Sequence, residues 1–190
     1  MFARVFLILA LLAQPAFAHA PVFDLNKTAK TAEAPFIVED PEHSKAIFSE
    51  LTGAAHYYRI DAPEAFDFYV GMTAPKLDAC GLQQTFSFDV LNADMKRIDG
   101  RDGSTFKWWE WYEEFGKNWY WVGPEIGKDF LSTTRYAAGT YYIRIFNKEN
   151  TGKYVLAVGD DERFGPAEIF RAVTSMGKIN RTFWNNADCS

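Results

Sequence analysis

This sequence of 190 residues lacks several features that enzymes and nucleic-acid-binding proteins commonly carry. It contains no H-E-x-x-H motif, no G-x-S-x-G motif and no glycine-rich phosphate loop, so the motifs of zinc proteases, serine hydrolases and nucleotide-binding proteins are absent. It has no run of basic residues, and its formal net charge is −5. This charge pattern argues against a nucleic-acid partner, because phosphate groups are bound by clustered lysine and arginine.

Cysteine is scarce, and the two present are Cys80 and Cys189. In an oxidising compartment they could pair and tie the C-terminal tail to the rest of the domain. The alternative is one buried thiol and one free thiol in the tail, because separation in sequence does not say whether two Cβ atoms meet. The sequence leaves both alternatives open.

Long apolar runs are also missing, with one exception at the N-terminus. Residues 1–18 have the three parts of a cleavable secretory signal: Arg4, the apolar run Val5–Leu12 and the small-x-small site Ala16–Ala18. Cleavage after Ala18 is favoured over cleavage two residues later, which would leave a proline first. No later stretch is long and apolar enough to span a bilayer. We therefore expect a periplasmic or secreted protein that begins at His19 and has no integral membrane segment after cleavage.

The rest of the chain is rich in apolar and aromatic residues, at 48% and 17% of the sequence. Its length suits a single domain. Short runs of Phe, Tyr, Val and Ile recur about every ten residues between Gly, Pro, Asn and Asp, a spacing typical of a β-sandwich or barrel. Residues 94–104 are predicted to be a turn-rich polar loop and 129–134 a strand. The apolar runs that we predict to be strands cover 46–51, 56–61, 65–71 and 85–91.

Two further runs, Ala138–Phe146 and Gly152–Gly159, are separated by a polar turn and predict a β-hairpin. With their G-x-Y and G-x-Y-x-L-x-V patterns they resemble the bacterial pre-peptidase C-terminal type of β-sandwich, best over residues 137–158. That resemblance implies an antiparallel, jelly-roll-like sandwich that serves as an exported accessory or binding module. The chain is also similar to small exported proteins of unknown function that start H-x-P-x-F, here at His19, a likeness that implies no activity.

The predicted fold class is therefore all-β, an antiparallel, jelly-roll-like sandwich with a C-terminal helix. Residues 19–45 are expected to form an N-terminal arm, with a polar and mobile lead over 24–34, and 46–164 the sandwich. Residues 165–190 are expected to hold a helix and tail. Within that last segment Ile169, Phe170, Val173 and Met176 recur at helical spacing after a Gly-Pro start.

His19 is the sharpest candidate for chemistry. If the chain begins there, one residue offers both an α-amine and an imidazole Nδ1, and a second imidazole from His43 or His56 would complete a planar nitrogen set that suits Cu(II). The first residue then resembles the start of copper proteins such as the lytic polysaccharide monooxygenases. A histidine at this position by chance is the alternative, since the chain has three histidines.

Five tryptophans lie close together, at Trp108, Trp109, Trp111, Trp119 and Trp121. Strand alternation sends Trp108 and Trp109 to opposite faces, so at least one aromatic row should lie near solvent. Exposed rings beside carboxylates could stack on sugars or hold a cationic group over a ring face. The competing interpretation, which we favour, is that the C-terminal helix or the N-terminal arm covers the second face.

Acidic residues at 160–162, with Asp99 and Asp102, raise the question of calcium, which binds six to eight oxygens from such loops. Their spacing fits no EF-hand, and solvated loops are the interpretation we favour.

The sequence thus predicts an exported non-catalytic binding protein with copper at His19 as its most specific element. The alternatives are a carbohydrate or small-ligand module using the tryptophans and a copper-dependent oxidative enzyme. It does not identify the small ligand, glycan or protein that would be bound.

Overall fold

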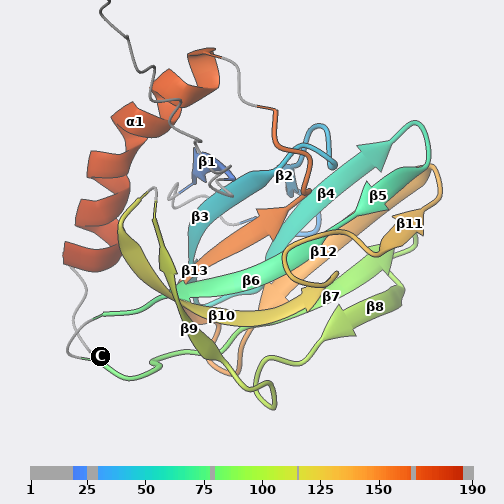
Figure 1. Ribbon diagram of the computed structural model, residues 1–190. Helices are drawn as coiled ribbons and strands as arrows, with labels where there is room; N and C mark the ends of the chain where they lie inside the picture. The colour runs from blue at the N-terminus through green and yellow to red at the C-terminus, as the bar shows by residue number, and fades with distance from the viewer. Residues whose placement is uncertain (1–18, 25–29, 78–79, 115, 164–165, 186–190) are drawn as a thin grey trace, which may run out of the picture.

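Two β-sheets packed face to face form the body of the molecule, and one helix lies on the outer face of the larger sheet (Figure 1). The computed structural model describes residues 19–24, 30–77, 80–114, 116–163 and 166–185. The prediction of an all-β sandwich with a C-terminal helix is confirmed. The predicted signal and Cys189 lie outside the described residues.

The strands divide into a six-stranded sheet, a five-stranded sheet and one short pair, and nearly all neighbours are antiparallel. In spatial order the six-stranded sheet contains β1 (Ala20–Phe23), β3 (Lys45–Thr52), β13 (Thr151–Val158), β6 (Val70–Pro75), β10 (Asn118–Ile126) and β9 (Trp109–Glu113). The five-stranded sheet contains β2 (Phe36–Ile37), β4 (His56–Ala62), β12 (Gly139–Phe146), β7 (Ser87–Asn92) and β8 (Arg97–Arg101). The short pair joins β11 (Thr134–Tyr136) to β5 (Phe66–Phe68).

The segment expected to be an N-terminal arm is part of both sheets. Strand β1 pairs in parallel with β3, and β2 pairs in parallel with β4, so each adds an edge strand to a sheet. Within the expected polar lead, Asp24 and Lys30 are buried and form an ion pair of 3.1 Å. The prediction of a separate arm over residues 19–45 was therefore wrong, because backbone pairing that the local sequence does not reveal fixes both ends of the segment.

Two local predictions also differ from the structure. The expected polar loop at 94–104 contains β8, which pairs with β7 although none of its five residues is buried. The expected strand at 129–134 is a tight turn instead, since Asp129 and Phe130 both have positive φ values and Lys128 bridges to Leu131. Strand β11 begins only at Thr134.

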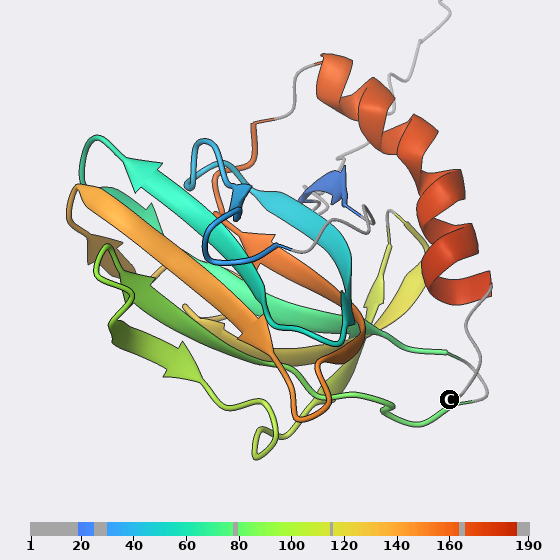
Figure 2. The same cartoon turned by 180° about the vertical axis from the view of Figure 1, so that it is seen from behind.

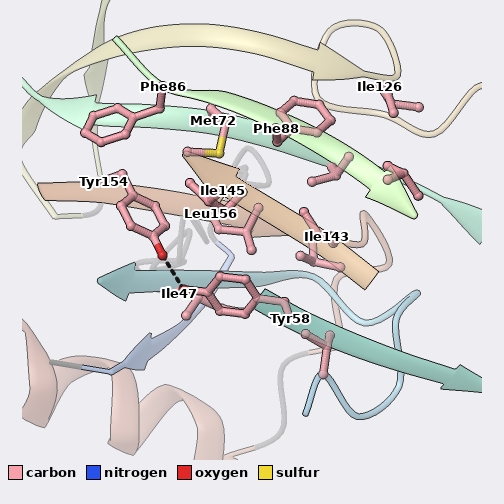
Figure 3. Close-up of a cluster of buried hydrophobic side chains, with 14 of the residues drawn as sticks. Ile47, Tyr58, Met72, Phe86, Phe88, Ile126, Ile143, Ile145, Tyr154 and Leu156 are labelled. Carbon is pink, nitrogen blue, oxygen red and sulfur yellow. Dashed lines mark hydrogen bonds between the residues drawn. The ribbon is translucent and has the colours of Figure 1, made fainter. Parts of the chain in front are cut away.

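Strand alternation builds the core between the sheets. In the stretch from β5 through β6, Phe66, Phe68, Val70 and Met72 all point inward and are buried. Facing rings and aliphatic side chains from both sheets fill the space between them (Figure 3). A polar network lies within this core, where the Tyr58 hydroxyl lies 2.6 Å from that of Tyr154.

Helix α1 (Pro166–Asn180) lies on the outer face of the six-stranded sheet (Figure 2). A second core lies beneath this helix and the π-helical turn η1 (Arg181–Asn185). The buried residues of this outer core are Phe48, Tyr120, Val155, Ile179 and Phe183. The helix therefore packs on the sandwich, as its helical spacing predicts. Within the described part of the chain, no helix combines the length and apolarity that crossing a membrane requires.

Candidate ligand-binding pocket

A pocket with a volume of about 90 Å³ opens on the outer face of the six-stranded sheet. Its floor is formed by small side chains, Ala46 on β3, Gly71 on β6 and Ala157 on β13. These three positions are adjacent in the sheet register, because Ala157 pairs with both Ala46 and Gly71. Three neighbouring residues with little or no side chain therefore leave a hollow in the sheet surface.

Strand alternation in β6 explains how the floor forms. Because Val70 and Met72 point into the sandwich core, Tyr69, Gly71 and Thr73 point outward, and all three line the pocket. A Cβ atom at Gly71 would lie 2.5 Å from the Tyr69 hydroxyl oxygen. Glycine at this position thus lets the Tyr69 ring lie across the floor.

Aromatic rings form the wall on the side of the β9–β10 hairpin. The Trp111 ring on β9 lies 5.8 Å from that of Tyr120 on β10 and 5.3 Å from that of Phe130, between ring centroids. Figure 1 shows that the tip of this hairpin rises beside the C-terminal end of α1, where Asn118 donates a hydrogen bond of 2.8 Å to Asn180. The hairpin and the helix together enclose one end of the pocket.

A β-bulge brings Glu125 into the pocket. The register between β10 and β6 shifts between Val122 and Glu125, so that Glu125 pairs with the outward-facing Gly71. Without the extra residue, alternation from Val122 would turn the Glu125 side chain to the interior, and bulges commonly redirect a side chain in this way. The carboxylate then accepts hydrogen bonds from the Tyr69 hydroxyl at 3.1 Å and from the backbone N–H groups of Asp129 and Phe130 at 2.9 and 3.2 Å.

These hydrogen bonds hold the turn that carries Phe130. Asp129 and Phe130 have φ values of 53° and 67°, a conformation that costs free energy for residues with a Cβ atom. The Glu125 carboxylate compensates by binding both backbone N–H groups of the turn. Phe130 is thereby placed against Trp111 at the pocket wall.

His19 lies at the other end of the pocket, directly before β1. Its ring centroid is 6.2 Å from that of Tyr69, and its Nε2 atom is enclosed with no hydrogen-bond partner among the residues that the structure describes. Burial lowers the pKa of His19 to about 4, although the Asp160 carboxylate acts in the opposite direction. The imidazole is therefore neutral at neutral pH, and Nε2 can act as a donor or an acceptor toward a ligand.

The predicted metal ligands lie on different faces of the sheet. The His56 ring lies inside the sandwich, where its Nδ1 atom is 2.8 Å from the Tyr154 hydroxyl, whereas His19 is on the outer face. His43 forms a backbone bridge with Asp161 in the loop before β3. Within the ranges that the structure describes, no group of three His, Cys, Asp or Glu side chains could hold a metal ion. Copper binding through His19 stays a prediction, and His56 is not positioned to be its second ligand.

The five tryptophans divide among three environments. Trp108 is a core residue, 8% exposed, whose indole N–H donates to the Gly103 carbonyl at 2.8 Å, so it is not available to a ligand. Trp111 lines the pocket, and Trp121 packs against the core between the sheets. Trp109 and Trp119 are exposed, at 45% and 40%.

The prediction that Trp108 and Trp109 lie on opposite sides agrees with these exposures. The register places Trp109 and Trp111 on the pocket face of the hairpin and Trp119 on the other face, beside Tyr112 and Lys76. The tryptophans therefore do not form one continuous platform. Glycan binding stays a prediction, and in this structure it would rest on Trp109 and Trp119 separately.

The acidic residues considered for calcium bind neighbouring groups of the protein. Asp160 accepts a hydrogen bond from the Ser132 N–H at 2.6 Å, and Asp161 pairs with Arg163 at 2.6 Å. Asp99 pairs with Arg101 at 2.6 Å, on β8. The contacts of Asp160 and Asp161 stabilise loops and that of Asp99 lies within a strand, and calcium binding stays a prediction.

Cys80 is 9% exposed and takes part in a disulfide bond. Cys189 lies outside the described residues, so its pairing with Cys80 stays a prediction.

The pocket residues that the sequence did not single out include Tyr69, Glu113, Glu125 and Phe130. Tyr69 and Gly71 could have been placed on one outward face from the alternation in 66–72. The bulge that redirects Glu125 and the turn that carries Phe130 depend on pairing with a distant strand, which no local pattern reveals.

The two buried histidines predict a loss of stability in mild acid. Burial lowers the pKa of His56 to about 4 from 6.5, with the charge of Lys30 adding to the effect, and burial lowers the pKa of His19 similarly. Between pH 6.5 and 4 the unfolded chain then binds more protons, so the free energy of unfolding should fall as pH falls, by up to about 3 kcal/mol for His19 and by less for His56.

Urea unfolding at several pH values would measure this dependence. Above pH 6.5 these two groups should contribute no slope, and the His56→Gln variant should show a shallower decline than the parent between pH 6.5 and 4. A parent profile that is flat across that window would contradict the prediction.

Comparisons with known proteins identify no family. No protein-family profile matches the sequence, and the comparison with curated proteins finds no match. Among solved structures, the chain is similar to the catalytic domain of a GH87 alpha-1,3-glucanase in complex with nigerose, at 12% identity and a TM-score of 0.31. A variant of that domain in complex with tetrasaccharides gives 13% identity and a TM-score of 0.28. In both comparisons the similarity covers 62% of this chain and 23% of the other, and it carries no argument about function.

Proposed function

We propose that this protein binds a small, mainly apolar ligand in the pocket on the outer face of the six-stranded sheet. The observation that carries the proposal is the combination of a floor of Ala46, Gly71 and Ala157 with aromatic walls and a few polar groups at the ends. Concave, largely apolar sites with a few well-placed polar groups are typical of small-molecule binding. The volume of about 90 Å³ suits a ligand of a few non-hydrogen atoms.

The enclosed Nε2 atom of His19 supports the same proposal. Buried polar side-chain atoms normally have a hydrogen-bond partner, and leaving one without a partner costs free energy. A ligand with one polar group could supply the partner that the described part of the chain does not. Binding, rather than a reaction, is the function that this arrangement supports best.

Filling the pocket tests the proposal. Ala157→Phe adds a ring over the floor and should abolish binding of a small neutral probe, 3,3-dimethylbutan-1-ol, while leaving the protein folded because the ring occupies open space. Binding would be measured by titration, following the NMR signals of the tryptophan indole groups, since the Trp111 ring lines the pocket.

The matched control is Thr134→Phe, which adds the same ring at an exposed position on β11, away from the pocket. This variant should bind the probe as the parent does. Failure of the parent to bind any small probe in the pocket, or unchanged binding by Ala157→Phe, would overturn the proposal.

A further inference from the structure

We infer that the pocket selects a small organic cation with a methylated ammonium group. This inference rests on the proposed function and names the class of ligand. Three features carry it: the aromatic enclosure, the charge of the lining and the hydrogen bonds that the pocket carboxylates already make.

Aromatic rings surround the space where the ligand would lie. Trp111, Tyr120 and Phe130 form one wall, Tyr69 lies across the floor, and Phe48 borders the helix side. The face of an aromatic ring carries partial negative charge, so a cation within about 6 Å of several ring centroids is attracted by each of them. A neutral ligand of the same shape would gain only the apolar contacts.

The charged side chains that line the pocket are of one sign. Glu113 and Glu125 contribute carboxylates, and no lysine or arginine is among the described residues that line it. An anionic ligand would have to enter beside two carboxylates without a lysine or arginine side chain in the described lining to compensate, which is unfavourable in a partly desolvated site. A cationic ligand would instead be stabilised by both.

The existing hydrogen bonds of the carboxylates distinguish one kind of cation from another. Both oxygens of Glu125 accept from protein donors, namely Tyr69 and the backbone N–H groups of Asp129 and Phe130. Glu113 accepts from the Gly116 N–H at 2.6 Å. A primary ammonium has three N–H donors that need acceptors when it leaves water, whereas a quaternary ammonium has none. The pocket thus provides negative charge and aromatic ring faces, while its carboxylates already accept hydrogen bonds from the protein. This combination suits a methylated ammonium group.

The polar end of the ligand can be placed as well. Nε2 of His19 is the enclosed polar side-chain atom without a partner among the described residues of the lining. A hydroxyl group can donate to or accept from it. A small cation with a quaternary ammonium at the aromatic wall and a hydroxyl toward His19 would therefore make favourable contacts with the aromatic rings, the carboxylates and the His19 imidazole.

Two probes of the same shape and different charge test the inference. Choline carries a trimethylammonium group, and 3,3-dimethylbutan-1-ol replaces its nitrogen by carbon and is neutral. Calorimetric titration of the purified protein should show that choline binds at least about tenfold more tightly than the neutral alcohol. The anionic 3,3-dimethylbutanoate should bind more weakly than either.

A conservative variant separates charge from packing. Glu113→Gln keeps an oxygen that can accept from Gly116 and removes the negative charge, so it should weaken choline binding about threefold to tenfold and affect the binding of the neutral alcohol much less. Equal or tighter binding of the neutral alcohol by the parent, or an equal loss for both probes in the variant, would overturn the inference and leave the proposed function standing. Binding of neither probe would overturn both.

Discussion

Gly103→Ala should lower the free energy of unfolding by about 3–5 kcal/mol, at the upper end of the range for single substitutions. A Cβ atom at this position would lie 2.6 Å from the carbonyl carbon of Phe86 and closer still to its oxygen. The backbone of Gly103 cannot move away easily, because its N–H donates to the Ser87 hydroxyl at 3.0 Å and its carbonyl accepts from the Trp108 indole at 2.8 Å. Relief of the overlap would break these buried hydrogen bonds.

Urea unfolding followed by tryptophan fluorescence would measure the loss. Gly81→Ala is the matched control, since a Cβ atom there would meet nothing within 4 Å, and its effect should stay within about 1 kcal/mol. If the two variants prove equally stable, the close approach of residues 86 and 103 is not a constraint on the fold.

Phe183→Ala should also be strongly destabilising, by about 3–5 kcal/mol, and should loosen the C-terminal helix. The Phe183 side chain is fully buried in η1, and its ring packs edge-on against that of Phe48 at 5.2 Å between centroids. It belongs to the cluster that holds α1 against the six-stranded sheet. Because Met176 of α1 lines the pocket, the substitution should also weaken ligand binding.

Hydrogen exchange would separate these effects by showing faster exchange of the amides of α1 than of β13 in the variant. Phe170→Ala is the control on the same helix, because the Phe170 side chain is 71% exposed. It should leave both stability and exchange within error of the parent. Unchanged protection of α1 in Phe183→Ala would show that other contacts hold the helix.

Much of the fold follows from local patterns. The alternation of Phe66, Phe68 and Val70 with outward-facing residues is typical of a strand with one face on the core, and helical spacing after a Gly-Pro start predicts the helix that the structure shows as α1. Strand β8 escaped prediction because its residues are polar, and its place depends on backbone pairing with β7. Strands β1 and β2 were not predicted for a similar reason. Each pairs with a neighbouring strand, β3 or β4, that its own sequence does not specify.

The site could be predicted only in part. His19 and Trp111 were singled out, and both line the pocket. The five tryptophans do not form one binding surface, although they lie close together in the sequence. Trp108 is buried in the core, and strand alternation places Trp109 and Trp119 on opposite faces of the hairpin. The concavity itself arises from small residues on three strands that meet only after the sheet has formed, and Glu125 reaches it through a bulge.

The position of β13 has a consequence for the order of folding. This strand is central in the six-stranded sheet, between β3 and β6, yet it is among the last elements in the chain. Its pairing joins Thr151 to Thr52 and Val158 to Lys45, so closure spans about a hundred residues. Topologies dominated by such distant pairings fold slowly, because loop entropy is lost before the contacts form. Because β13 begins at Thr151, the central part of the six-stranded sheet cannot close until most of the chain has been synthesised.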